Sequence, residues 1–314
     1  MASFIKVTMD AVDIVLIQQL LMNSRTPYRE LAEKLGLSVN AVHKRVNHLM
    51  EIGVIKAFTA RVGLMALEMD SVTVMAWGNT TSNAIDEITE RLGADETIYW
   101  VTVTGGNNLY IGAHLKGIGD LDRFVSFLKT EGRVQDPTIM IQSAFGGTMP
   151  TAVPLVGHLS SLDYRIINSL GKDSRKRVST ISEELGVSAT TVRRRLSKMM
   201  DEGSIELSLE WYPDKSNDIM TILHLDLDEA TDGSKIVPIL YNNYSPNVMF
   251  HLGGSNMPNH FLGIVWTNTM GEVQDIRRRL EAEAIVKTAM PNVIHDGKLY
   301  DTWRDEIVKK KASN

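Results

Sequence analysis

The chain repeats itself, because residues 13–55 align on residues 163–205 without a gap, at an offset of 150 residues. The matching positions are mostly glycines and apolar residues, together with a Ser-Arg pair, and they include Leu20 and Leu170, Ser24-Arg25 and Ser174-Arg175, Leu35-Gly36 and Leu185-Gly186, Val42 and Val192, Gly53 and Gly203, and Ile55 and Ile205. A gapless match of this length indicates duplication, which restricts the chain to folds in which one supersecondary unit occurs twice.

The first copy has the pattern of a helix-turn-helix. Its apolar spacing and its caps predict three helices and an extended wing, over 13–22, 28–35, 39–50 and 54–62. Asp10 is placed to cap the first helix, Gly36 to end the second in a left-handed turn, and Ser38 to cap the third. The buried side of the third helix is made by Val42, Val46 and Leu49. A helix, a turn containing glycine and a helix capped by serine together indicate a winged helix-turn-helix.

The second copy repeats this arrangement. Its helices and wing are expected over 162–169, 178–185, 189–200 and 204–212. Gly186 occupies the turn and Ser188 the cap, at the positions equivalent to those of the first copy. The sequence therefore predicts two helix-turn-helix domains in one chain.

A segment of different rhythm follows each copy. The first alternates strand and helix patterns over 72–77, 82–92, 97–104, 109–115, 118–129 and 138–142, and the second does so over 219–227, 234–241, 247–252, 261–267, 270–283 and 284–290. The order β-α-β-β-α-β is that of a ferredoxin-like domain.

These patterns predict an α+β chain in which two winged helix-turn-helix domains alternate with two ferredoxin-like domains. The expected parts are the helix-turn-helix domains 9–62 and 159–212, the ferredoxin-like domains 70–143 and 218–291, a Gly- and Pro-containing linker 144–158, and a tail 292–314. The basic run Lys309–Lys311 near the end of the tail is interpreted as a solvated segment, with DNA contact as the less favoured alternative.

Composition narrows the function classes. The chain has no cysteine, which excludes disulfides, thiolate metal sites and cysteine nucleophiles, and no apolar run approaches the length of a membrane span. Its start has no pattern of a secretion signal, so we expect a cytoplasmic protein. The formal net charge of −5 disfavours a protein that coats nucleic acid, but it does not exclude a sequence-specific reader with locally placed basic groups.

The segment 35–46, followed by Gly53-Val54-Ile55, resembles the Lrp/AsnC (feast/famine) family of transcription regulators. Asp13 and the run Asn23-Ser24-Arg25 also stand where that family has an Asp and an Asn-x-Arg pattern. The resemblance implies a DNA reader followed by a ferredoxin-like (RAM-type) domain, which in the family mediates dimerisation and often responds to an amino acid. This chain departs from the family pattern by carrying two modules, so we expect an intramolecular pseudo-dimer that assembles further.

The side of each third helix opposite its apolar stripe is expected to enter the major groove of double-stranded DNA. The candidate DNA-binding residues are Ser38, Asn40, His43, Lys44, Arg45 and Asn47 in the first copy, and Ser188, Thr190, Thr191, Arg193, Arg194, Arg195, Ser197 and Lys198 in the second. Arg45 and Arg195 lie next to the stripe, so they either reach phosphate or brace the fold. Neither 38–50 nor 188–200 contains an acidic residue. Because the outward residues differ between the copies, we expect an asymmetric target.

Two glycine-containing hairpins are candidate effector loops. They comprise Gly105, Gly106, Asn107 and Asn108, and Gly253, Gly254, Ser255 and Asn256. In the family that the chain resembles, small ligands bind between sheet domains near this hairpin. The alternative, which each loop alone favours, is that the glycines only form a turn that requires positive φ.

An enzyme of another class is the rival interpretation, because sirohaem (tetrapyrrole) decarboxylases use the same architecture. Such an enzyme requires histidines near the second domain, and the chain offers His114, His224, His251 and His260 on or near predicted strands. Their spacing matches no metal-binding pattern, and the sequence contains no nucleophile elbow or phosphate loop. We therefore expect no enzyme, no metal and no cofactor. A third interpretation is an architectural DNA-binding protein with little sequence preference.

Overall fold

The computed structural model describes residues 8–67, 69–142 and 158–313. The chain divides into two compact units, one of which holds nearly all of both helix-turn-helix copies, while the other holds the two segments that follow them. Of the described residues, the reader unit contains 16–67, 69–71, 158–211 and 301–313, and the sheet unit contains mainly 72–142 and 212–300. All but the last residue of the linker predicted at 144–158 lies outside the described residues. No helix among the described residues is long and apolar enough to cross a membrane.

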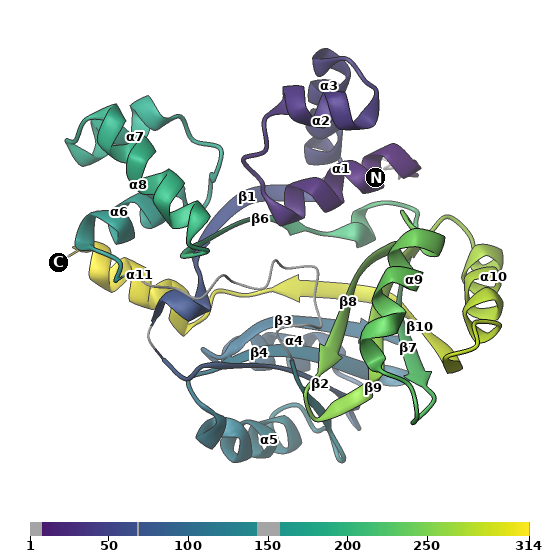
Figure 1. The fold of residues 1–314 in the computed structure, drawn as a ribbon. Helices are drawn as coiled ribbons and strands as arrows, with labels where there is room; N and C mark the ends of the chain where they lie inside the picture. The colour runs from purple at the N-terminus through teal and green to yellow at the C-terminus, as the bar shows by residue number, and fades with distance from the viewer. Residues whose placement is uncertain (1–7, 68, 143–157, 314) are drawn as a thin grey trace, which may run out of the picture. The chain divides into compact units, whose positions relative to one another are not determined.

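The helices of both copies form as predicted (Figure 1). They are α1 (Ala11–Met22), α2 (Tyr28–Leu35) and α3 (Val39–Glu51), and α6 (Ser161–Leu170), α7 (Val178–Leu185) and α8 (Ala189–Asp201). Gly36 and Gly186 end the second helix of each copy with φ of 65° and 66°, a conformation that glycine adopts without strain. The Ser38 hydroxyl accepts a hydrogen bond from the backbone N of Ala41 at 3.1 Å, so this predicted cap is confirmed.

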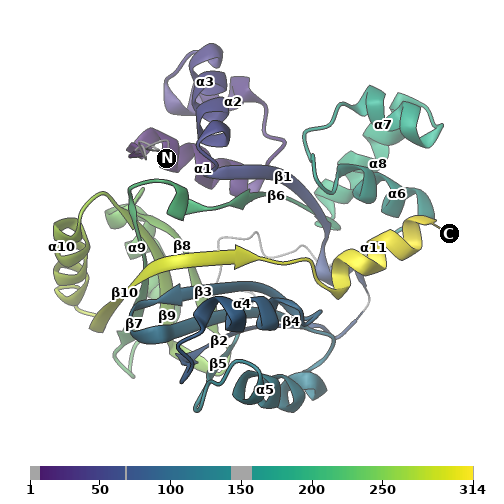
Figure 2. The same cartoon turned by 180° about the vertical axis from the view of Figure 1, so that it is seen from behind.

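The extended segment predicted after each third helix forms a strand. Each copy supplies one strand after its third helix, β1 (Ile55–Val62) or β6 (Ile205–Trp211), and these strands pair with each other in antiparallel register, with Phe58 opposite Leu209. Both views of the chain show them side by side (Figures 1 and 2). A single strand leaves its backbone groups unpaired, and the strand of the other copy satisfies them. The sequence predicted an extended segment in each copy but gave no sign that the two segments pair with each other.

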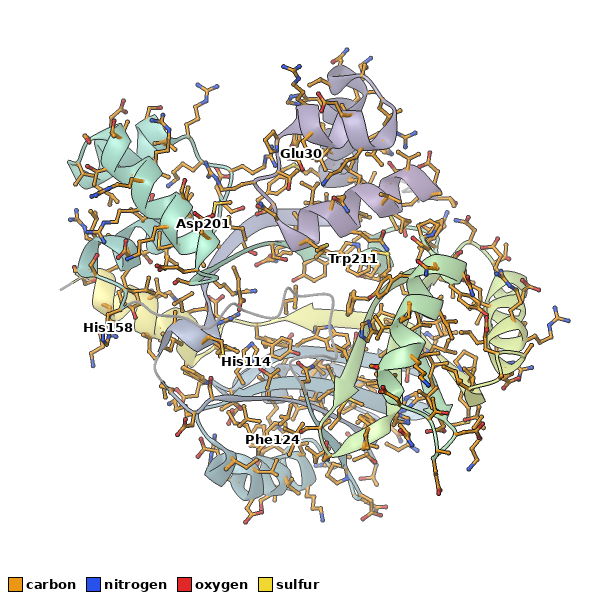
Figure 3. The ribbon with its side chains drawn as sticks, in the orientation of Figure 1. Glu30, His114, Phe124, His158, Asp201 and Trp211 are labelled. Carbon is orange, nitrogen blue, oxygen red and sulfur yellow. The ribbon has the colours of Figure 1, made fainter. Side chains whose placement is uncertain are left out.

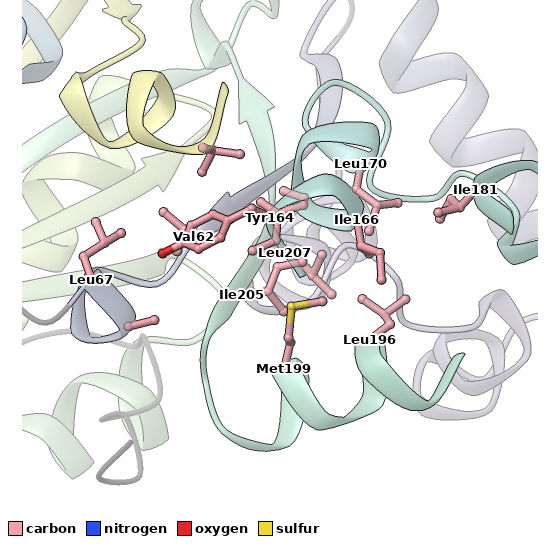
Figure 4. Close-up of a cluster of buried hydrophobic side chains, with 14 of the residues drawn as sticks. Val62, Leu67, Tyr164, Ile166, Leu170, Ile181, Leu196, Met199, Ile205 and Leu207 are labelled. Carbon is pink, nitrogen blue, oxygen red and sulfur yellow. The ribbon is translucent and has the colours of Figure 1, made fainter. Parts of the chain in front are cut away.

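The second copy shares its core with two distant parts of the chain. Tyr164, Leu196 and Met199 of the second copy form one buried cluster with Val62 of β1 and Trp303 of α11 (Trp303–Ser313) (Figure 4). The helix α11 lies within the predicted tail 292–314. Lys309, Lys310 and Lys311 are exposed on it, and the ammonium of Lys311 lies 4.8 Å from the centre of the Tyr164 ring.

The sheet unit contains both ferredoxin-like domains, each with the predicted element order. The first consists of β2 (Val72–Asn79), α4 (Ile85–Gly93), β3 (Ile98–Thr104), β4 (Asn108–Leu115), α5 (Leu121–Thr130) and β5 (Thr138–Ile141). The second consists of β7 (Ile219–Leu227), α9 (Ile236–Tyr244), β8 (Val248–Gly254), β9 (Met257–Thr267), α10 (Met270–Glu281) and β10 (Val286–Leu299). Their strands form one eight-stranded sheet in the order β5-β2-β4-β3-β10-β7-β9-β8.

Strand β10 joins the two ferredoxin-like domains and is longer than predicted. The sequence pattern predicts an end at residue 290, but the strand continues to Leu299. Its first half pairs with β7, from Val286 opposite Leu227 onward, and its second half pairs with β3, where Leu299 lies opposite Trp100. The second half of β10 is extended because it pairs with the edge of β3, which is distant in sequence. Local periodicity therefore did not reveal it.

The two ends of the sheet meet at the second glycine hairpin. Gly254 forms a bridge with Gln142, and the Asn256 side chain accepts a hydrogen bond from Ile141 N at 2.9 Å and donates one to Ile139 O at 2.8 Å. A Cβ on Gly254 would lie 2.5 Å from Cγ of Met140, so the close approach requires glycine. This hairpin thus connects β8 to β5.

Candidate nucleic-acid interface

The predicted reading surfaces are exposed. The third helix of each copy buries one apolar stripe, made by Val42, Val46 and Leu49 in α3 and by Val192, Leu196 and Met199 in α8. On the other sides, the solvent-exposed candidates are Ser38, Asn40, His43, Lys44, Asn47, Ser188, Thr190, Arg193, Arg194, Ser197 and Lys198. The geometry therefore leaves these side chains available for a ligand, as a helix in the major groove requires.

Arg45, Thr191 and Arg195 are only half-exposed. A guanidinium nitrogen of Arg195 lies 3.2 Å from the carboxylate of Asp163, whose side chain is 5% exposed. The hydroxyl of Thr191 lies 2.9 Å from that of the capping residue Ser188. The ion pair with Asp163 favours a bracing role for Arg195 over a phosphate-binding role.

A reciprocal contact connects the two copies within the reader unit. The hydroxyls of Ser24 and Ser174 are fully buried and lie 2.5 Å apart. Beside them Arg25 donates hydrogen bonds to the backbone oxygens of Ser174 and Lys176, while Arg175 donates to those of Ser24 and Thr26. Because each arginine donates hydrogen bonds to the other copy, the contact between the two helix-turn-helix domains is reciprocal. The sequence showed the repeated Ser-Arg pair but gave no sign that the pairs meet.

The crossed arginines are partly desolvated. Burial lowers the pKa of Arg25, and the neighbouring positive charge of Arg175 lowers it further. Burial likewise lowers the pKa of Arg175, while Asp173 opposes the effect in both cases. An arginine remains charged under such shifts, so the backbone oxygens of the other copy replace the water that each guanidinium loses.

The sheet unit contains a second polar cluster, which spans its two ferredoxin-like domains. The hydroxyl of Tyr110 lies 2.5 Å from Nε2 of His224, and Nδ1 of His224 lies 3.1 Å from Nε2 of His260. Nδ1 of His260 lies 2.6 Å from a carboxylate oxygen of Asp226, and Asn292 donates to the Tyr110 oxygen at 2.8 Å. Since a carboxylate only accepts hydrogen bonds, two neutral imidazoles satisfy the chain when Tyr110 donates to His224 and His224 donates to His260.

Burial sets the charge of this cluster. It lowers the pKa of His224 to about 4, to which the neighbouring imidazole of His260 also contributes, and it raises the pKa of Tyr110 to about 12. His224 and Tyr110 are therefore uncharged at neutral pH. The sequence singled out His224 and His260 as isolated strand residues and did not predict that they meet.

The other two strand histidines have aromatic partners. His114, labelled in Figure 3, stacks on Tyr99 with ring centres 4.3 Å apart. Nδ1 of His251 lies 2.9 Å from the hydroxyl of Tyr241. No group of three or more potential metal ligands occurs within residues 8–67, 69–142 and 158–313.

The two glycine hairpins differ in how they use their residues. In the first, Gly106 and Asn107 have φ of 71° and 57°, and the oxygen of Asn107 accepts a hydrogen bond from Thr80 N. The positive φ expected of a turn is confirmed there. In the second hairpin Gly253 and Gly254 do not adopt positive φ, so the turn explanation was wrong for this loop, whose glycine is required by the contact with β5.

Comparison with known proteins agrees with this geometry. Residues 9–56 match the family model described as winged helix-turn-helix DNA-binding, and residues 159–200 match the AsnC-type helix-turn-helix domain. An HTH-type transcriptional regulator of Pyrococcus horikoshii is 31% identical over 118 residues, which cover 37% of this chain and 79% of the relative. The HTH-type transcriptional regulator LrpA of the same organism is 32% identical over 32% of this chain and 70% of its own. This chain belongs to the Lrp/AsnC family. It is a DNA-binding transcriptional regulator of the Lrp/AsnC type, and double-stranded DNA is its partner.

The tandem arrangement of this Lrp/AsnC protein also has a structural counterpart. The siroheme decarboxylase NirDL matches 96% of this chain and 98% of its own, with a TM-score of 0.59 and 12% identity. At that identity the likeness concerns the fold alone, and it shows that two winged helices and two ferredoxin-like domains occur together in another protein.

Proposed function

We propose that this regulator binds double-stranded DNA sequence-specifically, with α3 and α8 in the major grooves of two half-sites of different sequence. The observation that carries the proposal is the exposed side of each third helix, which is basic and free of acids up to its last residue in a chain of net charge −5. Such local positive charge supplies phosphate contacts without a positive overall field.

The outward residues support different base preferences. In α8, Arg193 and Arg194 are exposed, and an arginine can donate two hydrogen bonds to guanine. At equivalent positions α3 presents His43 and Lys44, with Asn47 one turn further along the helix, and an asparagine can pair with adenine in the same way. We therefore expect α8, the more cationic of the two helices, to make the stronger electrostatic contact with its half-site.

The test is a binding titration with double-stranded DNA recovered by selection, at several salt concentrations. The variant Arg193→Ala/Arg194→Ala is expected to bind more weakly and to show a flatter dependence of log affinity on log salt, because phosphate contacts are lost. Arg29→Ala, at an exposed position outside the third helices, is the matched control. Unchanged affinity and slope in the double variant would contradict the assignment of α8.

A small-molecule effector is a finer part of the proposal, and the first hairpin is its better candidate. In the second hairpin, Ser255 N donates to Ile141 O at 2.9 Å and Asn256 pairs with β5, so both residues already have partners. Residues 105–108 have no such contact with β5 among the described hydrogen bonds. Thermal melting with each amino acid should show a shift that Gly106→Ala removes, while Gly119→Ala in another turn keeps it.

We also propose that one chain acts as its own pseudo-dimer, and that whole chains associate further. The first part is supported by the pairing of β1 with β6 and by the crossed arginines. Both contacts join one helix-turn-helix copy to the other within a single chain. Light scattering of the purified chain measures the second part. A mass near 35.0 kDa at all concentrations would contradict further association.

The decarboxylase alternative remains the second candidate, and the cluster of Tyr110, His224 and His260 is the observation in its favour. A decarboxylase function does not explain why the third helices are basic, so we rank this alternative below DNA binding. Titration with sirohaem, followed in the visible spectrum, separates the two functions. A tight complex with a shifted spectrum and no affinity for duplex DNA would reverse the ranking.

A further inference from the structure

The guanidinium of Arg175, which belongs to the second copy, covers an aromatic ring of the first. Its central carbon lies 4.1 Å from the centre of the Tyr28 ring and 5.5 Å from that of Phe58, distances at which a cation is attracted to the ring face. The same group donates hydrogen bonds to the oxygens of Ser24 and Thr26, in the turn that leads into α2. One side chain of the second copy thus fixes the start of α2.

The Tyr28 ring passes this contact on to the reading helix. Tyr28 is the first residue of α2, and its ring meets the ring of His43 edge to face, with centres 4.3 Å apart and planes at 85°. His43 lies on the exposed side of α3. Three groups in direct contact therefore lead from the second copy to the reading surface of the first.

No equivalent path runs in the opposite direction. Arg25 donates hydrogen bonds to the backbone oxygens of Ser174 and Lys176, just as Arg175 donates to backbone oxygens of the first copy. However, Val178 stands at the position of Tyr28, and Arg193 at that of His43, so neither ring is present. The crossed hydrogen bonds are symmetric, but the aromatic extension to the reading helix exists only for the first copy.

We propose that Arg175 is a positioning residue for DNA recognition by the first copy: through the rings of Tyr28 and His43 the second copy fixes the orientation of α3, whereas no corresponding path of rings leads from Arg25 to α8. This inference rests on the proposed function, since it requires that α3 and α8 read DNA. It makes the first half-site dependent on this arginine of the second copy, and the equivalent arginine of the first copy, Arg25, has no matching path to the second half-site.

The absence of cysteine allows a direct test. A DNA-cleaving reagent is attached to a single cysteine at the start of either reading helix, Val39→Cys in α3 or Ala189→Cys in α8. Each labelled protein is titrated against selected duplex DNA in three backgrounds, namely the parent, Arg175→Ala and Arg25→Ala. Cleavage at each half-site then reports separately on the occupancy of each reader.

In Arg175→Ala, cleavage from position 39 should require roughly tenfold more protein, as loss of a cation–π contact and two hydrogen bonds implies, while cleavage from position 189 changes much less. Arg25→Ala should affect both positions to a similar, smaller extent. Equal losses at both positions in Arg175→Ala, or the same pattern in the two variants, would overturn the proposal.

Two further variants separate positioning from folding. Tyr28→Val installs the residue of the second copy at a half-exposed position and keeps the arginine, and it should reproduce the selective loss at position 39. Arg175→Lys keeps a cation over the ring and should restore part of the signal. Unchanged cleavage in Tyr28→Val would overturn the aromatic path even if Arg175→Ala does not fold. Lack of cleavage at either position in the parent would instead overturn the reading role of the helices themselves.

Discussion

The two helix-turn-helix copies share their buried and capping residues but differ in their exposed residues. Both third helices have a serine cap and an apolar stripe, and both second helices end in a left-handed glycine. Their exposed sides differ, with His43 and Asn47 in α3 where α8 has Arg193 and Ser197. The duplication has kept the residues that form the helices and changed the exposed ones, as the proposal of two readers of different sequences requires.

The copies also differ in what supports them. The core of the second copy includes Trp303 of α11 and residues of β1, and its third helix is braced by the ion pair of Arg195 with Asp163. The first copy has instead the contact from Arg175 through Tyr28. Each copy therefore depends on a distant part of the chain, but on a different part and through a different kind of contact.

Removal of the α11 contact should have the largest effect, and it should fall on the second copy. Trp303 is 2% exposed, so Trp303→Ala is expected to destabilise the reader unit by about 3–5 kcal/mol through loss of burial and a cavity. Urea unfolding followed by circular dichroism measures the change. Lys310→Ala, on an exposed side of the same helix, is the matched control. An effect below about 1 kcal/mol would show that α11 is not part of this core.

Acidification should affect the sheet unit, where only the second domain contributes histidines to the cluster. The pKa of His224 is about 4 in the folded chain and 6.5 in the unfolded reference, so the unfolded chain binds the proton first. Stability should therefore fall as the pH decreases from about 6.5 to about 4, by at most about 3 kcal/mol from this group.

Urea midpoints across this pH range test the prediction, with His224→Gln as the comparison. The variant should lose stability at neutral pH but show a weaker dependence on pH. An identical pH dependence in both proteins would assign the titration to other groups.

The crossed serines should give the smallest effect and the most symmetric one. Ser24→Ala or Ser174→Ala removes one of two buried hydroxyls that bond to each other, so each variant should lose about 1 kcal/mol and the two should be equal. A double-mutant cycle measures the coupling between them. Unequal single losses would mean that the junction itself is asymmetric, in addition to the reading surfaces.

Local signals predicted most of the fold. The glycine and serine at each turn, and the stripe that includes Val42, placed the helices to within a few residues, because these features act over one or two turns of chain. The pairing of β1 with β6 and the extension of β10 to Leu299 could not be predicted in this way, since both depend on strands far away in sequence.

The candidate site was predictable to the same degree. The exposed residues of α3 and α8 follow from helical periodicity, but the crossed contacts of Arg25 and Arg175 join residues about 150 positions apart. The cluster of Tyr110 and His224 spans 114 positions. Such contacts carry no local pattern, so only the arrangement of the whole unit reveals them.

Selection of bound duplexes from a random DNA pool tests the central claim most directly. If α3 and α8 read DNA with different outward side chains, the recovered sites should contain two dissimilar half-sites in a fixed order, and Arg193→Ala should relax preference in only one of them. A symmetric palindrome, or no enrichment of any sequence, would contradict the account.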